Sequence, residues 1–364
     1  MPMIARRTLL ATAAATVAGP AMAQSVPQTA LNARARKKGL FFGSALNHDT
    51  LMNDPAATAR VNAECGIVVA EAAFKWADIR PTADDYDFTK ADALLGFATR
   101  NDLRIRGHTL VWHEGNPDWL PSKLTSGNAE KMLTDYIRTV VGRYKGKLVH
   151  WDVVNEVIDP DDKQPLNLRK TLWQQALGPA FLDIAFHTTA ATDPTALRVI
   201  NDYGTDYTLP WQERKRAALL ELLADMLRRK VPVQAVGLQA HLDAGEVTLD
   251  QNVLHKFVAD IAAMGLKVIV TELDVRDQRL PAYVPVRDDA VAAHARAWLD
   301  AVLAERAVLG VLTWGISDRN SWLNEKFPRP DKLAQRPLPL DASLNRKKLW
   351  SAIATSIDAA PTRT

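Results

Sequence analysis

Short apolar runs alternate along the chain with longer amphipathic stretches. Eight of these runs are rich in β-branched residues and favour buried strands, because such side chains pack well on a pleated backbone. The eight runs are Phe41–Leu46, Ile67–Ala72, Arg104–Trp112, Leu148–Glu156, Leu197–Tyr203, Ala235–Leu242, Lys267–Leu273 and Val308–Ile316. Strands that alternate with helices predict a parallel sheet.

The stretches between the runs have the spacing of helices. Glu213–Lys230 is the clearest, and Thr134–Tyr144 and Ala290–Val308 follow the same pattern. Eight strands with helical crossovers predict an α/β fold, a single (β/α)8 TIM barrel over residues 38–357. The alternative is an open doubly wound sheet, which would carry a glycine-rich phosphate turn after its first strand. Gly43-Ser44 is too little for such a turn.

Polar and aromatic residues collect at the carboxyl ends of the predicted strands. In an α/β barrel these ends meet on one face, which carries the chemistry. The residues at these ends are Asn47, His48, Glu71, His108, Trp112, His113, Asn155, Glu156, Asn201, Asp202, Tyr203, Gln239, His241, Glu272, Asp274 and Trp314.

Two of these residues, Glu156 and Glu272, each end an apolar run and lie far apart in the sequence. A carboxylate pair that faces one cleft is the machinery of glycoside hydrolysis. One carboxylate attacks the anomeric carbon and needs hydrogen-bond donors that keep it ionised, while the other transfers the proton. His241 is placed to donate to Glu272 and to be oriented by Asp274, and Asn155 supplies an amide for a substrate hydroxyl.

Other catalytic classes find little support in the sequence. His108 and His113 do not have the spacing of a zinc-binding helix, so we expect no metal. No Gly-x-Ser-x-Gly elbow occurs, which disfavours a serine hydrolase.

Several strings resemble those of the family 10 glycoside hydrolases, the endo-β-1,4-xylanase family. They are Gly107-His108-Thr109-Leu110-Val111-Trp112-His113, Trp151-Asp152-Val153-Val154-Asn155-Glu156, Asn201-Asp202-Tyr203, Gly237-Leu238-Gln239-Ala240-His241, Thr271-Glu272-Leu273-Asp274, Trp314-Gly315-Ile316-Ser317-Asp318 and Ser321-Trp322. Matching residues run through almost the whole chain after its first 23 residues, and their combination is highly specific.

The resemblance implies a role for each matching residue. Glu156 is then the acid/base and Glu272 the nucleophile, in a retaining enzyme that hydrolyses β-1,4-linked polysaccharide, with xylan as the expected substrate and no cofactor. Supporting residues are Asn155, His241, Gln239 and Asp274. Substrate-binding residues are Glu71, Lys75, His108 and Tyr203, with Trp112, Trp314 and Trp322 as aromatic walls on the glycone side. Tyr203 is expected toward the leaving group.

The chain departs from the family pattern at three positions. Ala72 replaces the usual Asn of the Glu-Asn-x-x-Lys-Trp string, Glu114-Gly115 replaces a frequent Ser-Gln, and Gly204 replaces an Asn. Two of these losses affect the second sugar on the non-reducing side. Two alternatives therefore stay open: hydrolysis of a β-1,4-glucan or exopolysaccharide backbone, and a carbohydrate-binding barrel with little turnover.

Composition adds little that changes this interpretation. The 364 residues have a formal net charge of +3 and no basic cluster interleaved with aromatics, so we expect no nucleic-acid partner. The aromatic set contains ten Trp, a residue suited to stacking on pyranose rings. Cys65 is the single cysteine, which excludes an intramolecular disulfide. We expect a monomer without a membrane span.

The amino-terminal 23 residues resemble an export signal. Arg6-Arg7 precedes a weakly apolar stretch and then Ala21-Met22-Ala23, which is typical of a signal-peptidase site. The paired arginines favour twin-arginine export over an ordinary secretory signal, so we expect a periplasmic or secreted protein. Residues 24–37 are expected to form a loose lead-in, and 358–364 a frayed tail.

Overall fold

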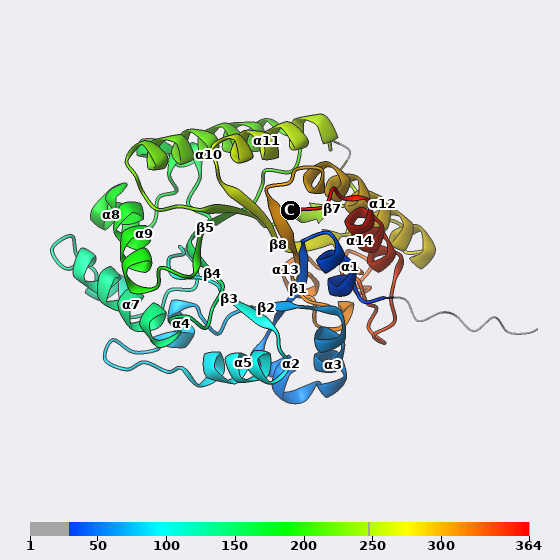
Figure 1. Ribbon diagram of the computed structural model, residues 1–364, viewed down its shortest axis with the longest axis horizontal. Coiled ribbons are helices and arrows are strands. Elements are labelled where there is room, and N and C mark those ends of the chain that lie inside the picture. Colours follow the sequence, from blue (N-terminus) through cyan, green and yellow to red (C-terminus); the bar gives the residue numbers. More distant parts are fainter. Residues whose placement is uncertain (1–28, 247, 364) are drawn as a thin grey trace, which may run out of the picture.

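The computed structural model describes residues 29–246 and 248–363. Eight parallel strands form a closed ring, because β1 pairs with β9 and β6 pairs with β8 (Figure 1). The strands of the ring are β1 Phe41–Leu46, β2 Ile67–Ala70, β3 Arg104–Gly107, β4 His150–Asn155, β5 Leu197–Asp202, β6 Ala235–Leu238, β8 Lys267–Arg276 and β9 Val308–Thr313. The predicted (β/α)8 TIM barrel is confirmed.

Side chains of the strands are buried on both faces of the sheet, which explains their continuous apolar runs. In β1, Phe41 and Ala45 belong to a small cluster with residues of the other strands inside the ring. Their neighbours Phe42 and Leu46 belong to the large cluster between the strands and the helices. The alternation follows from the two-residue repeat of a strand.

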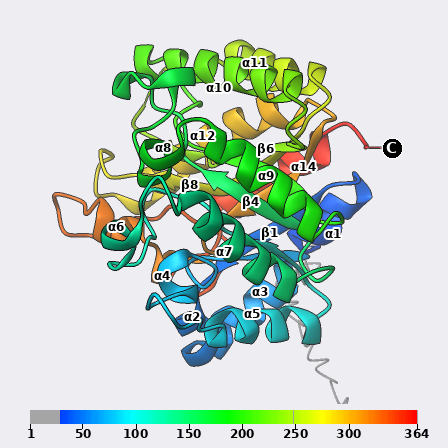
Figure 2. The ribbon, with the colours of Figure 1, turned by 90° about the vertical axis from the view of Figure 1, so that its left-hand side faces the viewer.

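Helices surround the ring. Those with eight or more residues are α3 Pro55–Glu64, α5 Thr89–Arg100, α7 Ala129–Arg143, α9 Ala180–Thr192, α10 Pro210–Arg228, α11 Gln251–Ala263, α12 Val284–Leu303 and α14 Lys348–Ala359. Shorter helices are α1 Leu31–Lys37, α2 His48–Asn53, α4 Trp76–Ile79, α6 Leu120–Lys123, α8 Leu172–Leu177 and α13 Leu323–Lys326, with 3-10 turns η1 Pro160–Asp162, η2 Pro165–Asn167 and η3 Asp318–Asn320. Helix α9 packs over β4 and β5 with α7 beside it (Figure 2).

The predicted helices are present, but they begin earlier than expected. Helix α10 starts at Pro210 instead of Glu213, and α12 starts at Val284 instead of Ala290. Proline in the first turn explains both differences, since its missing N–H has no partner there in any case. No helix among residues 29–246 and 248–363 is long and apolar enough to cross a membrane.

Several predicted strands are too long at their carboxyl ends. β3 stops at Gly107 instead of Trp112, and the predicted Ala235–Leu242 divides into β6 and the short β7 His241–Asp243. Ala240 takes a positive φ of 61° at the break. The apolar pattern continues there because the chain leaves the sheet while still buried.

Both ends of the described chain are ordered, which corrects two predictions. Residues 31–37, expected to be part of a loose lead-in, form α1, whose Leu31 and Ala35 are buried. The expected tail continues α14 to Ala359, and the N–H of Arg363 donates to the carbonyl of Lys38 at 2.8 Å. Helices α1 and α14 lie side by side in Figure 1 and contact each other. The predicted export signal, residues 1–23, lies outside the described residues.

Candidate active site

A cavity of about 590 Å³ opens at the carboxyl ends of the barrel strands. Its lining brings together residues from most of the βα loops, as expected for an α/β barrel. The predicted site residues in the lining are Glu71, Lys75, His108, Trp112, Asn155, Glu156, Tyr203, Gln239, His241, Glu272, Trp314 and Trp322. Asp274 is the one predicted site residue outside the lining, and it lies behind His241.

Glu156 follows the last residue of β4 in a backbone conformation that is unusual for a side-chain-bearing residue. Its φ is +57°, and both its backbone polar groups are bonded: the N–H donates to the carbonyl of Asn201 at 2.8 Å, and the carbonyl accepts from Arg169 Nε at 2.8 Å. These bonds hold a conformation that costs about 1–3 kcal/mol. The carboxylate accepts from Gln239 Nε2 at 3.0 Å and Asn155 Nδ2 at 3.2 Å.

Glu272 lies in β8 and is almost fully buried. Its carboxylate accepts from Asn201 Nδ2 at 2.8 Å and lies 3.2 Å from Nε2 of His241. Burial opposes ionisation, but these hydrogen bonds and the neighbouring imidazoles outweigh it and lower the pKa of Glu272 to about 2. Glu272 is therefore ionised, as a carboxylate nucleophile must be.

A chain of polar groups stands behind Glu272. Nδ1 of His241 lies 2.9 Å from Oδ1 of Asp274, and Nε1 of Trp322 donates to Oδ2 of the same carboxylate at 2.7 Å. Burial opposes protonation of His241, yet Asp274 and Glu272 together raise its pKa to about 10. The predicted His241–Asp274 arrangement is present, and Trp322 extends it to a wall of the cleft.

Asn201 is a central residue that sequence reasoning did not assign to the site. Its amide donates to Glu272 and also to Oδ1 of Asn155 at 2.8 Å, while its own Oδ1 accepts from Thr271 at 2.7 Å. One side chain therefore links the nucleophile to the residue that precedes Glu156. The signal was its position at a strand end in the Asn201-Asp202-Tyr203 string.

The residues expected on the glycone side follow β2, β3 and β9 and line one side of the cleft. Nδ1 of His108 lies 2.8 Å from Oδ2 of Asp152, so its other nitrogen is the one left for substrate. The ammonium of Lys75 lies 4.6 Å from the centre of the Trp112 ring. Burial lowers the pKa of Lys75 and raises that of Glu71. Trp314 meets His108 edge to face.

Two of the positions at which the sequence predicts a departure from the family pattern, Gly115 and Ala72, lie near this side. Gly115 has a φ of +32°, and a Cβ there would lie 3.1 Å from Trp112 and 3.4 Å from Lys75. The gap beside it, between Lys75 and Trp112, is too small for a water molecule. Gly115 therefore opens no enclosed space for a larger sugar at that point. Ala72 is half-buried and does not line the cleft.

Residues that follow β4 and β5 line the side of the cleft on which the leaving group is expected. Tyr203 is held between two cations: Arg169 Nη2 donates to its hydroxyl at 3.0 Å, and Nζ of Lys215 lies 3.6 Å from its ring centre. Nδ1 of His113 lies 3.9 Å from Oε2 of Glu156, and burial lowers the pKa of His113. The sequence placed His113 at a strand end without giving it a role, and it did not single out Arg169.

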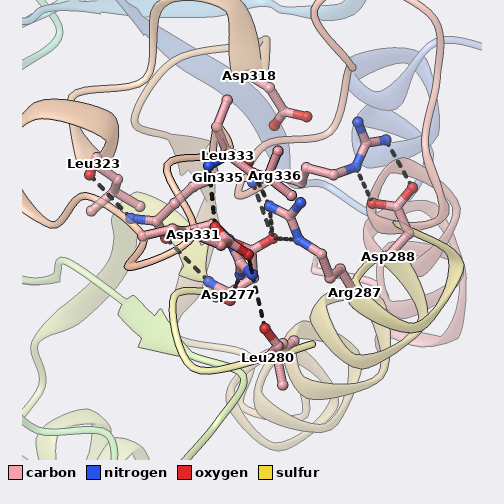
Figure 3. Close-up of polar contacts among 12 residues, drawn as sticks. Asp277, Leu280, Arg287, Asp288, Asp318, Leu323, Asp331, Leu333, Gln335 and Arg336 are labelled. Atoms are coloured by element: carbon pink, nitrogen blue, oxygen red, sulfur yellow. Dashed lines mark hydrogen bonds and ion pairs between the residues drawn. The ribbon is translucent and has the colours of Figure 1, made fainter. Parts of the chain in front are cut away.

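A buried ion cluster supports the loop that carries Trp322 (Figure 3). Asp277 accepts from Arg287 Nε at 2.7 Å, and Arg329 donates to the Asp277 carbonyl. Gln335 joins this cluster to the loop, because its Nε2 donates to the carbonyl of Leu323 at 3.0 Å while its Oε1 accepts from the Asp277 N–H at 3.2 Å. The ion cluster therefore holds in place the loop that carries Trp322, a wall of the cleft.

The arrangement supports acid/base and nucleophilic chemistry by its side chains. Within the described part of the chain, no group of three or more His, Cys, Asp or Glu residues fits a metal ion. One ionised carboxylate and a second carboxyl at the end of β4 line the same cleft. This is the residue set of a glycosidase.

Known proteins agree with this assignment. Endo-1,4-beta-xylanase 3 of Hypocrea jecorina is 31% identical over 318 residues, which cover 87% of this chain and 82% of that protein. A thermostable celloxylanase of Thermoclostridium stercorarium is 33% identical over 79% of this chain and 78% of its own length. The crystal structure of xylanase 10B from Thermotoga petrophila RKU-1 in complex with xylobiose superposes with a TM-score of 0.82 at 27% identity, covering 92% and 98% of the two chains. The model of glycosyl hydrolase family 10 matches residues 30–356, and the chain belongs to this family.

Proposed function

We propose that the protein is a retaining endo-β-1,4-xylanase. The observation that carries the proposal is the state of Glu272: a buried carboxylate held ionised by Asn201 and His241 in the cleft that Glu156 also lines. The proposal is further supported by relatives named as xylanases and by the xylobiose bound in a similar structure.

The mechanism follows from the two carboxylates. Glu272 attacks the anomeric carbon while Glu156 gives its proton to the leaving glycosidic oxygen, and the C–O bond breaks. Glu156, now ionised, takes a proton from water, and the water oxygen displaces Glu272 from the sugar. Two inversions at one carbon return the original configuration. Sugar-binding groups are expected on both sides of Glu156 and Glu272, which supports cleavage of internal bonds of the polysaccharide.

The sugar preference needs a direct test. Initial rates on unsubstituted β-1,4-xylan and on a soluble β-1,4-glucan are compared, with Glu272→Ala as the blank. We expect xylan to be the faster substrate by a wide margin and the first product to have the β configuration by NMR. Faster cleavage of the glucan would replace the xylanase proposal with the glucan-backbone alternative. Unchanged hydrolysis by Glu272→Ala would refute the enzymatic mechanism itself.

We also propose that the protein is exported in folded form. The basis is Arg6-Arg7 followed by a weakly apolar stretch and Ala21-Met22-Ala23. Replacing both arginines by lysine (Arg6→Lys, Arg7→Lys) should keep the activity inside the cell if the twin-arginine route is used. Normal export of this variant would favour the ordinary secretory route, since that route needs only positive charge in this region.

We also propose that the protein is a monomer. Gel filtration with light scattering tests this oligomeric state.

A further inference from the structure

Trp211 is a large apolar side chain that remains exposed inside the cleft. Its exposed fraction is 41%. Seven other large hydrophobic side chains are exposed in the described chain, and none of them lines the cavity. An indole left open to solvent in a binding cleft offers a flat apolar face without a protein partner.

The barrel topology places Trp211 on the same arc as Tyr203, the side on which the leaving group is expected. The strands of the two catalytic glutamates, β4 and β8, divide the ring into two arcs. One arc contains β9, β1, β2 and β3, whose loops carry the residues expected on the glycone side. The other contains β5 and β6. Trp211 lies in the first turn of α10, which follows β5 and Tyr203.

The conformation of Trp211 depends on Gly204. A Cβ at position 204 would lie 2.5 and 2.6 Å from two carbons of the Trp211 ring, so a side chain there would displace the indole. Gly204 also has a φ of +69°, which favours glycine. The ring therefore lies against the backbone next to Tyr203, and Gly204, a departure from the family pattern, makes the room.

The backbone that carries Trp211 is fixed. The side-chain oxygen of the next residue, Gln212, accepts from the N–H groups of Asp206 and Tyr207, at 2.7 Å each. These bonds tie the start of α10 to the loop after β5. The indole is consequently carried on a fixed backbone and lies against Gly204, which lowers the entropic cost of binding against it.

We propose that Trp211 is the stacking platform of a distal leaving-group subsite, which binds the apolar face of a β-1,4-linked pyranose beyond the sugar at Tyr203. The inference rests on the proposed glycosidase function and deepens it. A platform there favours long substrates and cleavage away from their reducing ends. Gly204 acts as a positioning residue for the ring.

The test compares two substrates that differ in the length of the leaving group. Xylohexaose places sugars beyond the first leaving-group position, whereas 4-nitrophenyl β-xylobioside places only nitrophenol there. For Trp211→Ala we expect the ratio of kcat/KM for xylohexaose to that for the aryl xylobioside to fall about tenfold, the loss typical of an important aromatic contact. The loss should reside mainly in KM, and Trp211→Phe should restore most of it.

Matched variants separate stacking from structural damage. Tyr283 is 68% exposed and lies outside the cleft, so Tyr283→Ala should leave the ratio unchanged. Gly204→Ala should lower the ratio as Trp211→Ala does, with circular dichroism and melting temperature confirming that it folds. An unchanged ratio in Trp211→Ala, or an equal loss on both substrates, overturns the proposal. Absence of wild-type activity on both substrates would instead refute the glycosidase function.

Discussion

Nε2 of His241 lies 3.2 Å from Oε2 of Glu272, and its other ring nitrogen lies 2.9 Å from Oδ1 of Asp274. One imidazole therefore bridges two carboxylates. A ring in this position donates from both nitrogens only when it is protonated, which agrees with its raised pKa of about 10. The positive charge keeps the nucleophile ionised.

Replacing His241 by Gln should move the acid limb of the pH–rate profile. The amide keeps a hydrogen-bond donor but removes the positive charge that lowers the pKa of Glu272. The acid limb of kcat/KM should therefore shift upward by about 1–3 pH units. Initial rates from pH 3 to 8 on an aryl xylobioside measure this. An acid limb identical to that of the wild type would show that His241 does not set the ionisation of Glu272.

Asn201 should matter for catalysis as much as the groups that the sequence identified. Asn201→Ala removes the 2.8 Å hydrogen bond to Glu272 and the one to Asn155. A hydrogen bond to a charged group contributes about 1.5–3 kcal/mol, so kcat/KM should fall about 10- to 100-fold. Thr271→Val is the matched control, because it removes only the donor to Asn201 and should cost less. Equal losses in both variants would contradict a direct role for the amide.

The Glu272–His241 pair should make the free energy of unfolding depend on pH. The pKa of Glu272 is depressed to about 2, so its contribution to the free energy of unfolding is present above pH 4.5 and is lost as the pH falls through 2. The pKa of His241 is raised to about 10, so its contribution is full below pH 6.5 and is lost as the pH rises through 10.

The measurement is the free energy of unfolding of the wild type minus that of Glu272→Gln. This difference should be about 2 kcal/mol smaller at pH 3 than at pH 6, and it should also decrease toward pH 9. Urea titrations at the three pH values give it. A difference that is constant over this range would mean that the two groups are not perturbed in the folded state.

The sequence predicted the barrel well because its strands are buried on both faces. Runs such as Val268-Ile269-Val270 favour a core strand, and each catalytic glutamate follows such a run after one polar residue. Strand ends were harder to place, because apolar residues such as Leu110, Val111 and Leu242 remain buried after Gly107 and Leu238, where the strands end. Hydrophobicity reports burial, and burial continues where the sheet stops.

The sequence predicted those site residues whose polar or aromatic side chains stand at the end of a predicted strand. Asn201 had such a place, but nothing in the sequence says that its amide faces Glu272. Trp211 had no such signal, since a tryptophan in the first turn of a helix is usually packed. Its exposure depends on the backbone path of Gly204, which is a property of the fold. Arg169 reaches Glu156 from a loop whose path follows no periodic pattern.

The ion cluster beneath Trp322 should contribute strongly to stability. Asp277 is fully buried between Arg287 and Arg329, so Asp277→Ala leaves the buried guanidinium of Arg287 without its charge partner, while Arg329 keeps its ion pair with Asp331. Breaking a buried ion pair on one side costs about 3–5 kcal/mol. Asp135→Ala is the control, because it breaks the exposed pair with Lys131, and such pairs contribute at most about 1 kcal/mol.

The same variant should also change substrate binding, because the cluster holds the loop after Trp322. We expect Asp277→Ala to raise KM for xylan more than it lowers kcat, since Trp322 forms a wall of the cleft while Glu156, directly after β4, and Glu272, on β8, keep their places. Urea unfolding and steady-state kinetics on one preparation measure both effects. A large loss of stability with an unchanged KM would show that the cluster stabilises the barrel without positioning the aromatic wall.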